Sequence, residues 1–342
     1  MMISKKILVE GFKIGGEKTY VIAEVGSNHN QNLQLAYETI DAAVECGANA
    51  VKFQSINIEE LYYLPSLAIR ELHRKIDLAE EWHSLLKEYS DKKGITFFSS
   101  PTYLKAVDIL EETGVSLYKL ASAQIGTFPQ IVDKVARTGK PVIISTGIVN
   151  YRELQQVICI FQKANNTNLI ILHCNSIYPT PYNKVNLGLI DIYKQMFTYL
   201  VGFSDHTNGI TIPIAAVARG ACVIEKHFTL SRNLPVPDAG LSLEPSEFKA
   251  MVEGIRAVEE ANNLTPRTEI MSEEKTFKEA ILYRLVLKKD KKKGELLHFD
   301  DFTYLRYSEG IDCREIFPNI PTYITKDLSA GSLLKPEDVV HK

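Results

Sequence analysis

Eight short runs rich in β-branched and aromatic residues alternate with amphipathic helical stretches along most of the chain. They cover residues 20–26, 50–55, 95–101, 117–123, 141–147, 169–176, 199–205 and 222–228. Eight apolar strands that are each followed by a helix predict a parallel (β/α)8 TIM barrel, an α/β fold. A doubly wound sheet is the competing architecture. Its first strand usually leads into a GxGxxG loop, which VGSNHNQN (25–32) lacks.

Glycines mark the ends of several helical stretches. Gly47, Gly94, Gly114, Gly139 and Gly220 each come just after a helical pattern, where a C-cap glycine belongs. Beyond the last of these stretches, a polar segment (262–276) leads into short β-like pieces separated by turn signals. We therefore predict a barrel domain over 1–262 that carries the functional site, a linker over 263–280 and a small β-rich domain over 281–342.

Size and charge exclude several classes of protein. The 342 residues, 45% of them hydrophobic, suffice for one large core and a small second unit. A net charge of −3 gives no reason to expect nucleic acid or an acidic membrane as a partner. No apolar run reaches transmembrane length, the N-terminus lacks a signal-peptide pattern, and the five cysteines show no paired spacing. We expect a cytoplasmic protein with reduced thiols.

Polar side chains stand at the carboxyl end of every predicted strand, the end at which TIM barrels carry their active sites. A single strand-end serine usually caps the next helix, and a lone histidine is usually a core residue. Eight polar ends that converge on one mouth are harder to explain in that way. In chain order they are Glu24; Lys52 and Gln54; Ser99 and Ser100; Lys119 and Ser122; Ser145 and Thr146; Asn175 and Ser176; Ser204, Asp205 and His206; and Glu225 and His227.

The residue types at this mouth favour an anion site beside a metal. Lys52 and Lys119 lie among apolar strand neighbours, and a buried lysine is costly unless it meets an anionic partner. Together with the serine hydroxyls they suit a phosphate or carboxylate ligand. His206 and His227, on adjacent strands, suit a divalent metal of the Mn, Fe, Co or Zn type. Two ligands are too few for a structural zinc site, so an open metal that takes water or substrate oxygen fits better.

Taken together, these motifs make the chain resemble the sialic acid synthase family. The similar stretches are IAEVGSNHN (22–30), AVKFQS (50–55), SSPT (99–102), YKLAS (118–122), ISTG (144–147), HCNSIYPTP (173–181), GFSDHT (202–207) and IEKHFT (224–229). They occur in family order and span nearly the whole barrel. The C-terminal segment is similar to the antifreeze-like (SAF) domain of that family, with Arg306-Tyr307-Ser308-Glu309-Gly310 in place of its Arg-Pro-Gly-x-Gly signature.

The resemblance implies an enzyme that condenses phosphoenolpyruvate with an N-acyl-amino hexose to give a nine-carbon nonulosonic acid and phosphate. It implies that the phosphate and carboxylate are held by Lys52, Lys119, Ser100, Ser122, Ser145, Ser176 and Ser204, the serine at 176 standing where many relatives have asparagine. It implies that His206 and His227 bind the metal, expected to be Mn²⁺ with Mg²⁺ or Co²⁺ as alternatives. Residues that would face the sugar are Glu24, Gln54, Tyr178 and Asp238.

Two departures from the family pattern fall on the sugar side. Gln124 stands where relatives often have a carboxylate, and Leu282-Tyr283-Arg284 replaces a Phe-Arg-Arg-type pattern. The resemblance further implies a domain-swapped homodimer, in which Arg306 of the small domain reaches the partner's barrel and contacts the sugar's acyl group. Glu24 is the expected base, which orients the water that adds to the enol carbon. His29 and His173 are expected to be structural.

The sequence also allows other functions. The chain could be a metal-dependent aldolase or a synthase of the octulosonate phosphate type, which acts on a phosphorylated sugar and needs a further basic cluster. It could also be a carbohydrate-binding protein that has lost its chemistry. The sequence does not decide between N-acetylneuraminate, legionaminate, pseudaminate or another product.

Overall fold

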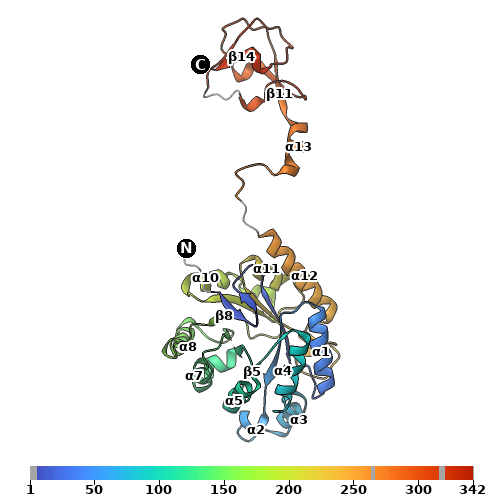
Figure 1. The fold of residues 1–342 in the computed structure, drawn as a ribbon, viewed down its shortest axis with the longest axis vertical. Helices are drawn as coiled ribbons and strands as arrows, with labels where there is room; N and C mark the ends of the chain where they lie inside the picture. The colour runs from blue at the N-terminus through green and yellow to red at the C-terminus, as the bar shows by residue number, and fades with distance from the viewer. Residues whose placement is uncertain (1–5, 263–265, 316–319, 342) are drawn as a thin grey trace. The chain divides into compact units, whose positions relative to one another are not determined.

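The structure, a computed structural model, describes residues 6–262, 266–315 and 320–341, and the chain divides into two units, Met1–Asn263 and Leu264–Lys342. Eight parallel strands form the centre of the first unit, in the order β5-β4-β3-β10-β9-β8-β7-β6 (Figure 1). At the seam between β5 and β6, Ser100 Oγ donates a hydrogen bond to the carbonyl oxygen of Lys119 at 3.1 Å. The strands are β3 (Tyr20–Gly26), β4 (Ala50–Ser55), β5 (Thr96–Pro101), β6 (Tyr118–Leu120), β7 (Val142–Ser145), β8 (Leu169–Cys174), β9 (Leu200–Asp205) and β10 (Val223–His227).

Each of the eight predicted runs contains one of these strands, so the predicted TIM barrel is confirmed. Helices surround the strands (Figure 1). The five glycines predicted to end helices all have positive φ, between 71° and 86°. The helices are α1 (Leu33–Glu45), α2 (Ile58–Leu61), α3 (Leu67–Ile76), α4 (Trp82–Lys93), α5 (Leu104–Thr113), α6 (Ser122–Thr127), α7 (Pro129–Ala136), α8 (Tyr151–Lys163), α9 (Tyr182–Val185), α10 (Gly188–Met196), α11 (Thr211–Ala218) and α12 (Pro245–Ala261).

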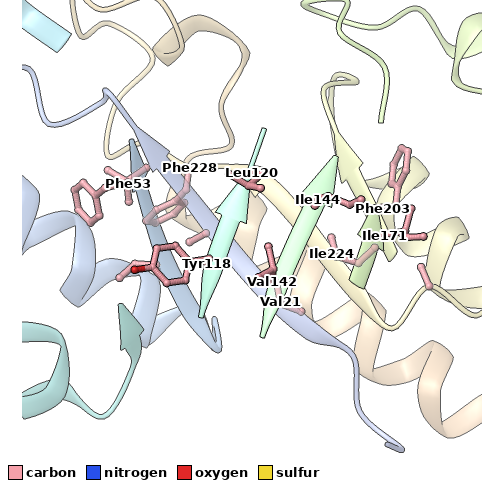
Figure 2. Packing of buried hydrophobic residues seen from close by; sticks show 14 of the residues in the cluster. Val21, Phe53, Tyr118, Leu120, Val142, Ile144, Ile171, Phe203, Ile224 and Phe228 are labelled. Carbon is pink, nitrogen blue, oxygen red and sulfur yellow. The ribbon is translucent and has the colours of Figure 1, made fainter. Parts of the chain in front are cut away.

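Strand alternation divides the barrel strands into an outer and an inner face. The outward side chains of the strands, among them Val51 and Phe53 of β4 and Val142 and Ile144 of β7, are buried in one cluster with the apolar faces of the helices (Figure 2). The residues between them point into the barrel. Every strand therefore presents apolar residues to the helices, whatever it carries on its inner face.

An N-terminal hairpin closes the amino-terminal end of the barrel. Strands β1 (Ile7–Val9) and β2 (Phe12–Ile14) pair antiparallel with each other. The hairpin side chains Ile7, Val9 and Ile14 are buried in one cluster with inward residues from the barrel strands, including Tyr20, Ile22, Ala50, Phe98, Ile143, Leu200 and Val223. The lower barrel interior is thus an apolar floor, which the sequence analysis did not predict.

The second unit is small and rich in short strands. Helix α13 (Ser272–Ile281), which has no buried residue, lies in the segment predicted as a linker (263–280) except for its last residue. Two antiparallel pairs follow: β11 (Tyr283–Leu287) with β12 (Phe302–Arg306), and β13 (Thr322–Ile324) with β14 (Val339–His341). They enclose a core of Leu285, Leu287, Leu297, Phe302, Ile311, Ile324 and Leu334. Among the described residues, no helix combines the length and apolarity that a membrane span requires.

Candidate active site

Four charged side chains occupy the inner face of the barrel above the apolar floor. Glu24, Lys52, Lys119 and Glu225 are all buried, and we call them the Glu–Lys quartet. Lys52 Nζ lies 2.7 Å from Glu24 Oε2 and 3.7 Å from Glu225 Oε2. Lys119 Nζ lies 2.9 Å from Glu225 Oε1. Each lysine therefore has a carboxylate partner within the protein itself.

These partners modify the expectation that the lysines depend on a ligand anion. The sequence pattern places Glu225 at a strand end but predicts no role for it. The signal that could have revealed it was its position on the same strand face as His227, one strand away from Lys52 across β3. Burial alone would raise the pKa of Glu225, but Lys119 and Lys52 outweigh it and lower that pKa to about 2. Glu225 is therefore ionised.

The other carboxyl behaves differently. Burial raises the pKa of Glu24 above its usual range, and Lys52 offsets this only in part. Gln54 Nε2 donates to Glu24 Oε1 at 2.7 Å, which holds the carboxyl group in place. Burial would lower the pKa of Lys52, but Glu225 and Glu24 hold it above its usual value. Of the two carboxyls, Glu24 is thus the one that more easily takes up and releases a proton.

Serine hydroxyls surround the quartet. Ser204 Oγ donates to Glu225 Oε1 at 2.9 Å. Ser122 Oγ accepts a hydrogen bond from the backbone N–H of Gly147 at 2.8 Å. A Cβ at Gly147 would lie 2.3 Å from Ser176 Oγ, so only glycine lets the backbone come this close. Ser145 Oγ is buried without a partner in the described part of the chain, so it is free to bind a ligand oxygen.

The two predicted metal ligands face each other across adjacent strands, with ring centroids 5.4 Å apart. His206 Nδ1 lies 2.8 Å from the carbonyl oxygen of Asn175, so Nδ1 carries the proton and Nε2 keeps its lone pair. Burial, with His227 adding to it, lowers the pKa of His206 to about 3, so the ring is neutral. His227 Nδ1 is buried and lies 4.0 Å from Asp238 Oδ2. Both rings can therefore offer a nitrogen to a cation.

Two imidazoles do not complete a coordination shell. Within residues 6–262, 266–315 and 320–341, no group of three or more His, Cys, Asp or Glu side chains could hold a metal ion. A cation bound to His206 and His227 would take its remaining ligands from water or from substrate oxygens. This donor set fits the open metal predicted from the sequence.

A cavity of about 370 Å³ brings most of the predicted residues together. Asp238 lies beside it, at His227. Tyr283 and Arg306 belong to the second unit, where they pair across β11 and β12 and the Arg306 guanidinium lies 5.4 Å from the Tyr283 ring centroid. The predicted residues that line the cavity are Glu24, Lys52, Gln54, Ser100, Lys119, Ser122, Gln124, Ser145, Ser176, Tyr178, Ser204, His206 and His227.

The cavity also has lining residues that were not predicted. They include Thr102, Ile148 and Cys174. Cys174 follows Leu172 on the inner face of β8, and its Sγ lies 3.9 Å from both Ser122 Oγ and His206 Nδ1. Strand alternation was the signal that could have identified it.

Two other histidines, predicted to be structural, are buried. His29 accepts a hydrogen bond from the backbone N–H of Gln31 at 3.2 Å and packs between Phe53 and Trp82. His173 Nε2 lies 2.6 Å from the carbonyl oxygen of Val185, on the outer side of β8. Neither lines the cavity.

Comparisons with known proteins agree with this geometry. A family model described as the NeuB family matches residues 39–265. An N,N'-diacetyllegionaminic acid synthase of Campylobacter jejuni is 37% identical, over 93% of this chain and 99% of its own. A pseudaminic acid synthase of the same species is 34% identical, over 94% and 97%. The crystal structure of an N-acetylneuraminic acid (sialic acid) synthetase from Leptospira borgpetersenii, in complex with citrate, has a TM-score of 0.74 and 34% identity, covering 81% of this chain and 98% of that one. The chain belongs to the NeuB family.

Proposed function

We propose that this protein is a cytoplasmic nonulosonate synthase. It condenses phosphoenolpyruvate with an N-acyl-amino hexose to give a nine-carbon α-keto acid and inorganic phosphate. The observation that carries the proposal is the buried pair Lys52 and Lys119, which lies among serine hydroxyls and beside His206 and His227 in a NeuB-family barrel. Relatives named as legionaminic and pseudaminic acid synthases support the product class.

Phosphoenolpyruvate would bind at the lysine level of the cavity. Lys52 and Lys119 would hold its phosphate and carboxylate, with the hydroxyls of Ser100, Ser122, Ser145, Ser176 and Ser204 donating hydrogen bonds. The two carboxylates of the quartet compete with the ligand for the lysines. Protonation of Glu24, whose pKa is raised by burial, would free Lys52 for the incoming anion.

A divalent cation, expected to be Mn²⁺, would be held by His206 and His227. When bound, it supplies Lewis-acid polarisation of the carbonyl of the open-chain sugar. The neutral state of His206 and the tautomer set by Asn175 suit this role.

The remaining chemistry falls to the chain's own residues. The methylene carbon of phosphoenolpyruvate forms a bond to the aldehyde carbon. The aldehyde oxygen takes the proton from Glu24 and becomes a hydroxyl group, which returns Glu24 to its carboxylate form. Water adds to the cationic enol carbon and gives a proton to Glu24, which Gln54 holds in place. The tetrahedral intermediate then breaks its carbon–oxygen bond to phosphate, and its hydroxyl proton passes to the leaving phosphate as the keto group forms. Lys52 and Lys119 stabilise the phosphate charge throughout.

The sugar end would be formed by Gln54, Gln124, Tyr178 and Asp238. Of the residues that line the described cavity, Lys52 and Lys119 are the only lysines and none is arginine. A synthase that acts on a phosphorylated sugar needs further basic groups there. The cavity therefore favours an uncharged sugar over the octulosonate phosphate alternative.

We also propose that the enzyme works as a domain-swapped homodimer, in which a C-terminal SAF domain covers the partner's barrel and contributes Arg306 and Tyr283 to the sugar site. Large apolar side chains are exposed on the segments that follow the carboxyl ends of the barrel strands, among them Tyr63, Ile148 and Ile177 on loops and Tyr182 at the start of α9. The second unit exposes Tyr283, Leu305 and Tyr307. Such surfaces suit burial against another chain.

The test is release of phosphate from phosphoenolpyruvate with a panel of 2-acetamido and 2,4-diacetamido hexoses. We expect release only when a suitable sugar is present, loss of release after EDTA treatment, and recovery with Mn²⁺. Lys52→Ala and Lys119→Ala should each lower kcat/KM for phosphoenolpyruvate about ten- to a hundredfold, the value of a charge-assisted contact. No release with any sugar would favour a carbohydrate-binding protein, and full activity after exhaustive EDTA treatment would exclude the metal.

A further inference from the structure

A buried ion pair joins the two strands that carry the histidines, on the face opposite to the cavity. Asp205 ends β9 directly before His206, and Lys226 precedes His227 in β10. The two residues are register partners across the strands. Their side chains are 0% and 1% exposed, and Lys226 Nζ lies 2.6 Å from Asp205 Oδ2. The pair thus links the backbone segments from which both histidines project.

The same pair also holds the residue that follows His206. Asp205 Oδ1 accepts a hydrogen bond from the backbone N–H of Thr207 at 2.9 Å, and Asp205 Oδ2 accepts one from Thr207 Oγ1 at 3.0 Å. Lys226 Nζ donates to the carbonyl oxygen of Thr207. His206 is therefore fixed from both sides, by the residue before it and by the residue after it.

Separate contacts fix the imidazole ring and the backbone of His206. The carbonyl oxygen of Asn175 binds Nδ1 of His206, and the backbone N–H of Thr180 donates to the carbonyl oxygen of His206 at 2.9 Å. A nitrogen–metal bond is about 2 Å long and has a narrow tolerance. Two rings with centroids 5.4 Å apart can share one cation only while their backbones keep this separation.

Fold stability alone does not account for the pair. A buried ion pair can often be replaced by apolar residues of similar volume without loss of stability. What apolar residues cannot supply is the set of directed hydrogen bonds to Thr207, which positions His206 relative to β10.

We propose that Asp205 and Lys226 are positioning residues that set the geometry of His206 relative to His227 and, through it, the affinity for the divalent cation. The proposal rests on the metal-dependent function proposed above. Neither residue is among those that line the described cavity. Their effect would therefore appear in metal binding rather than in binding of phosphoenolpyruvate at saturating metal.

The test is direct titration with Mn²⁺ alone, monitored by the electron paramagnetic resonance of the free ion. The double variant Asp205→Asn with Lys226→Met removes both charges and keeps the volumes. It should bind Mn²⁺ about ten- to a hundredfold more weakly, the usual effect of removing partners behind a metal ligand. At saturating Mn²⁺ its KM for phosphoenolpyruvate should equal that of the parent.

A matched control is Ser55→Ala. The Ser55 hydroxyl lies in a buried polar network on the same outer face, 2.8 Å from His83 Nε2 and from Ser99 Oγ, but on β4 rather than beside the histidines. It should keep the parent's affinity for Mn²⁺ even where its melting temperature falls. If it weakens Mn²⁺ binding as much as the double variant does, the effect is a general loss of packing and the proposal is overturned.

The outcomes separate this proposal from the metal assignment. If the parent binds Mn²⁺ and His206→Ala abolishes binding, while the folded double variant keeps the parent's affinity, the positioning role is overturned and the metal site stands. If the parent does not bind Mn²⁺, both fall. Should the double variant fail to fold, the isosteric Thr207→Val removes only the Oγ1 contact and should weaken Mn²⁺ binding severalfold. Parental affinity in that variant overturns the proposal as well.

Discussion

At the scale of single residues, each lysine of the Glu–Lys quartet has a buried carboxylate partner. Strand-end polarity located Glu24, Lys52, Lys119 and Glu225 at one mouth. It did not show that the lysines already have carboxylate partners, because side-chain pairing depends on distances between strands that are far apart in the sequence. The Lys119 Nζ to Glu225 Oε1 contact of 2.9 Å joins residues that lie 106 positions apart.

Removal of one partner should show how much this ion pair contributes to the free energy of unfolding. Glu225→Gln leaves the buried Lys119 ammonium without its carboxylate, and we expect the free energy of unfolding to fall by about 3–5 kcal/mol. The double variant Glu225→Gln with Lys119→Met should lose less than the single variant, because no buried charge stays unpaired. Urea unfolding at pH 7 measures both. A single variant as stable as the parent would mean that Glu225 is not the main partner of Lys119.

His29 should make the fold sensitive to acid. Burial lowers the pKa of His29 to about 4, below its unfolded value of about 6.5. Between these values the unfolded chain binds the proton more tightly, so stability is fully present above pH 6.5 and falls as the pH drops toward 4. From pH 7 to 4.5 the parent should lose about 2–3 kcal/mol more than His29→Asn. Equal losses in urea unfolding curves would contradict this assignment.

At the scale of elements, the sequence predicts the barrel strands much more readily than the N-terminal hairpin. The strands are apolar runs followed by helices, a pattern that repeats eight times. The hairpin strands are three residues long. In β1 the exposed residue stands between two buried ones, and in β2 it stands between the half-buried Phe12 and the buried Ile14. Runs this short carry little periodic signal. Their role depends on packing against residues such as Leu200, which lies about 190 positions away in the chain and is in contact only after the barrel has closed.

The hairpin should contribute to stability without affecting chemistry. Ile14 is fully buried at the barrel floor, and Ile14→Ala should cost about 2–5 kcal/mol of unfolding free energy. Leu8 on the same hairpin is 62% exposed, so Leu8→Ala should stay within about 0.5 kcal/mol of the parent and serves as the control. Both variants should keep the parental KM for phosphoenolpyruvate, because the floor lies at the opposite end from the mouth. A raised KM in Ile14→Ala would show that the two ends are coupled.

At the scale of the whole molecule, the sequence pattern predicted a large barrel followed by a small β-rich segment, and the structure has both. The pattern did not predict α13, because its residues read as a polar stretch without an apolar face that packs, and none of them is buried. In the proposed swapped dimer the second unit completes the site of another chain, and a single sequence carries no direct record of such a contact.

Mixing two inactive variants tests the swapped dimer. Lys52→Ala damages the barrel site and Arg306→Ala damages the proposed lid. After subunit exchange, a swapped dimer of the two has one site with both residues intact, so about a quarter of the parental activity should appear. A lid that covers its own barrel gives no recovery. Full activity of Arg306→Ala by itself would remove Arg306 from the site.

The apolar floor closes the barrel at its amino-terminal end, so the barrel interior is entered from the carboxyl ends of the strands. On β4, Lys52 lies one inward position deeper than Gln54, so the proposed anion site lies beneath the proposed sugar site. Substrate binding and product release should then be ordered. Phosphoenolpyruvate binds first, the sugar binds above it, and phosphate is released last. In steady-state kinetics, phosphate should be a competitive inhibitor with respect to phosphoenolpyruvate. An unreactive sugar analogue should be an uncompetitive inhibitor with respect to phosphoenolpyruvate.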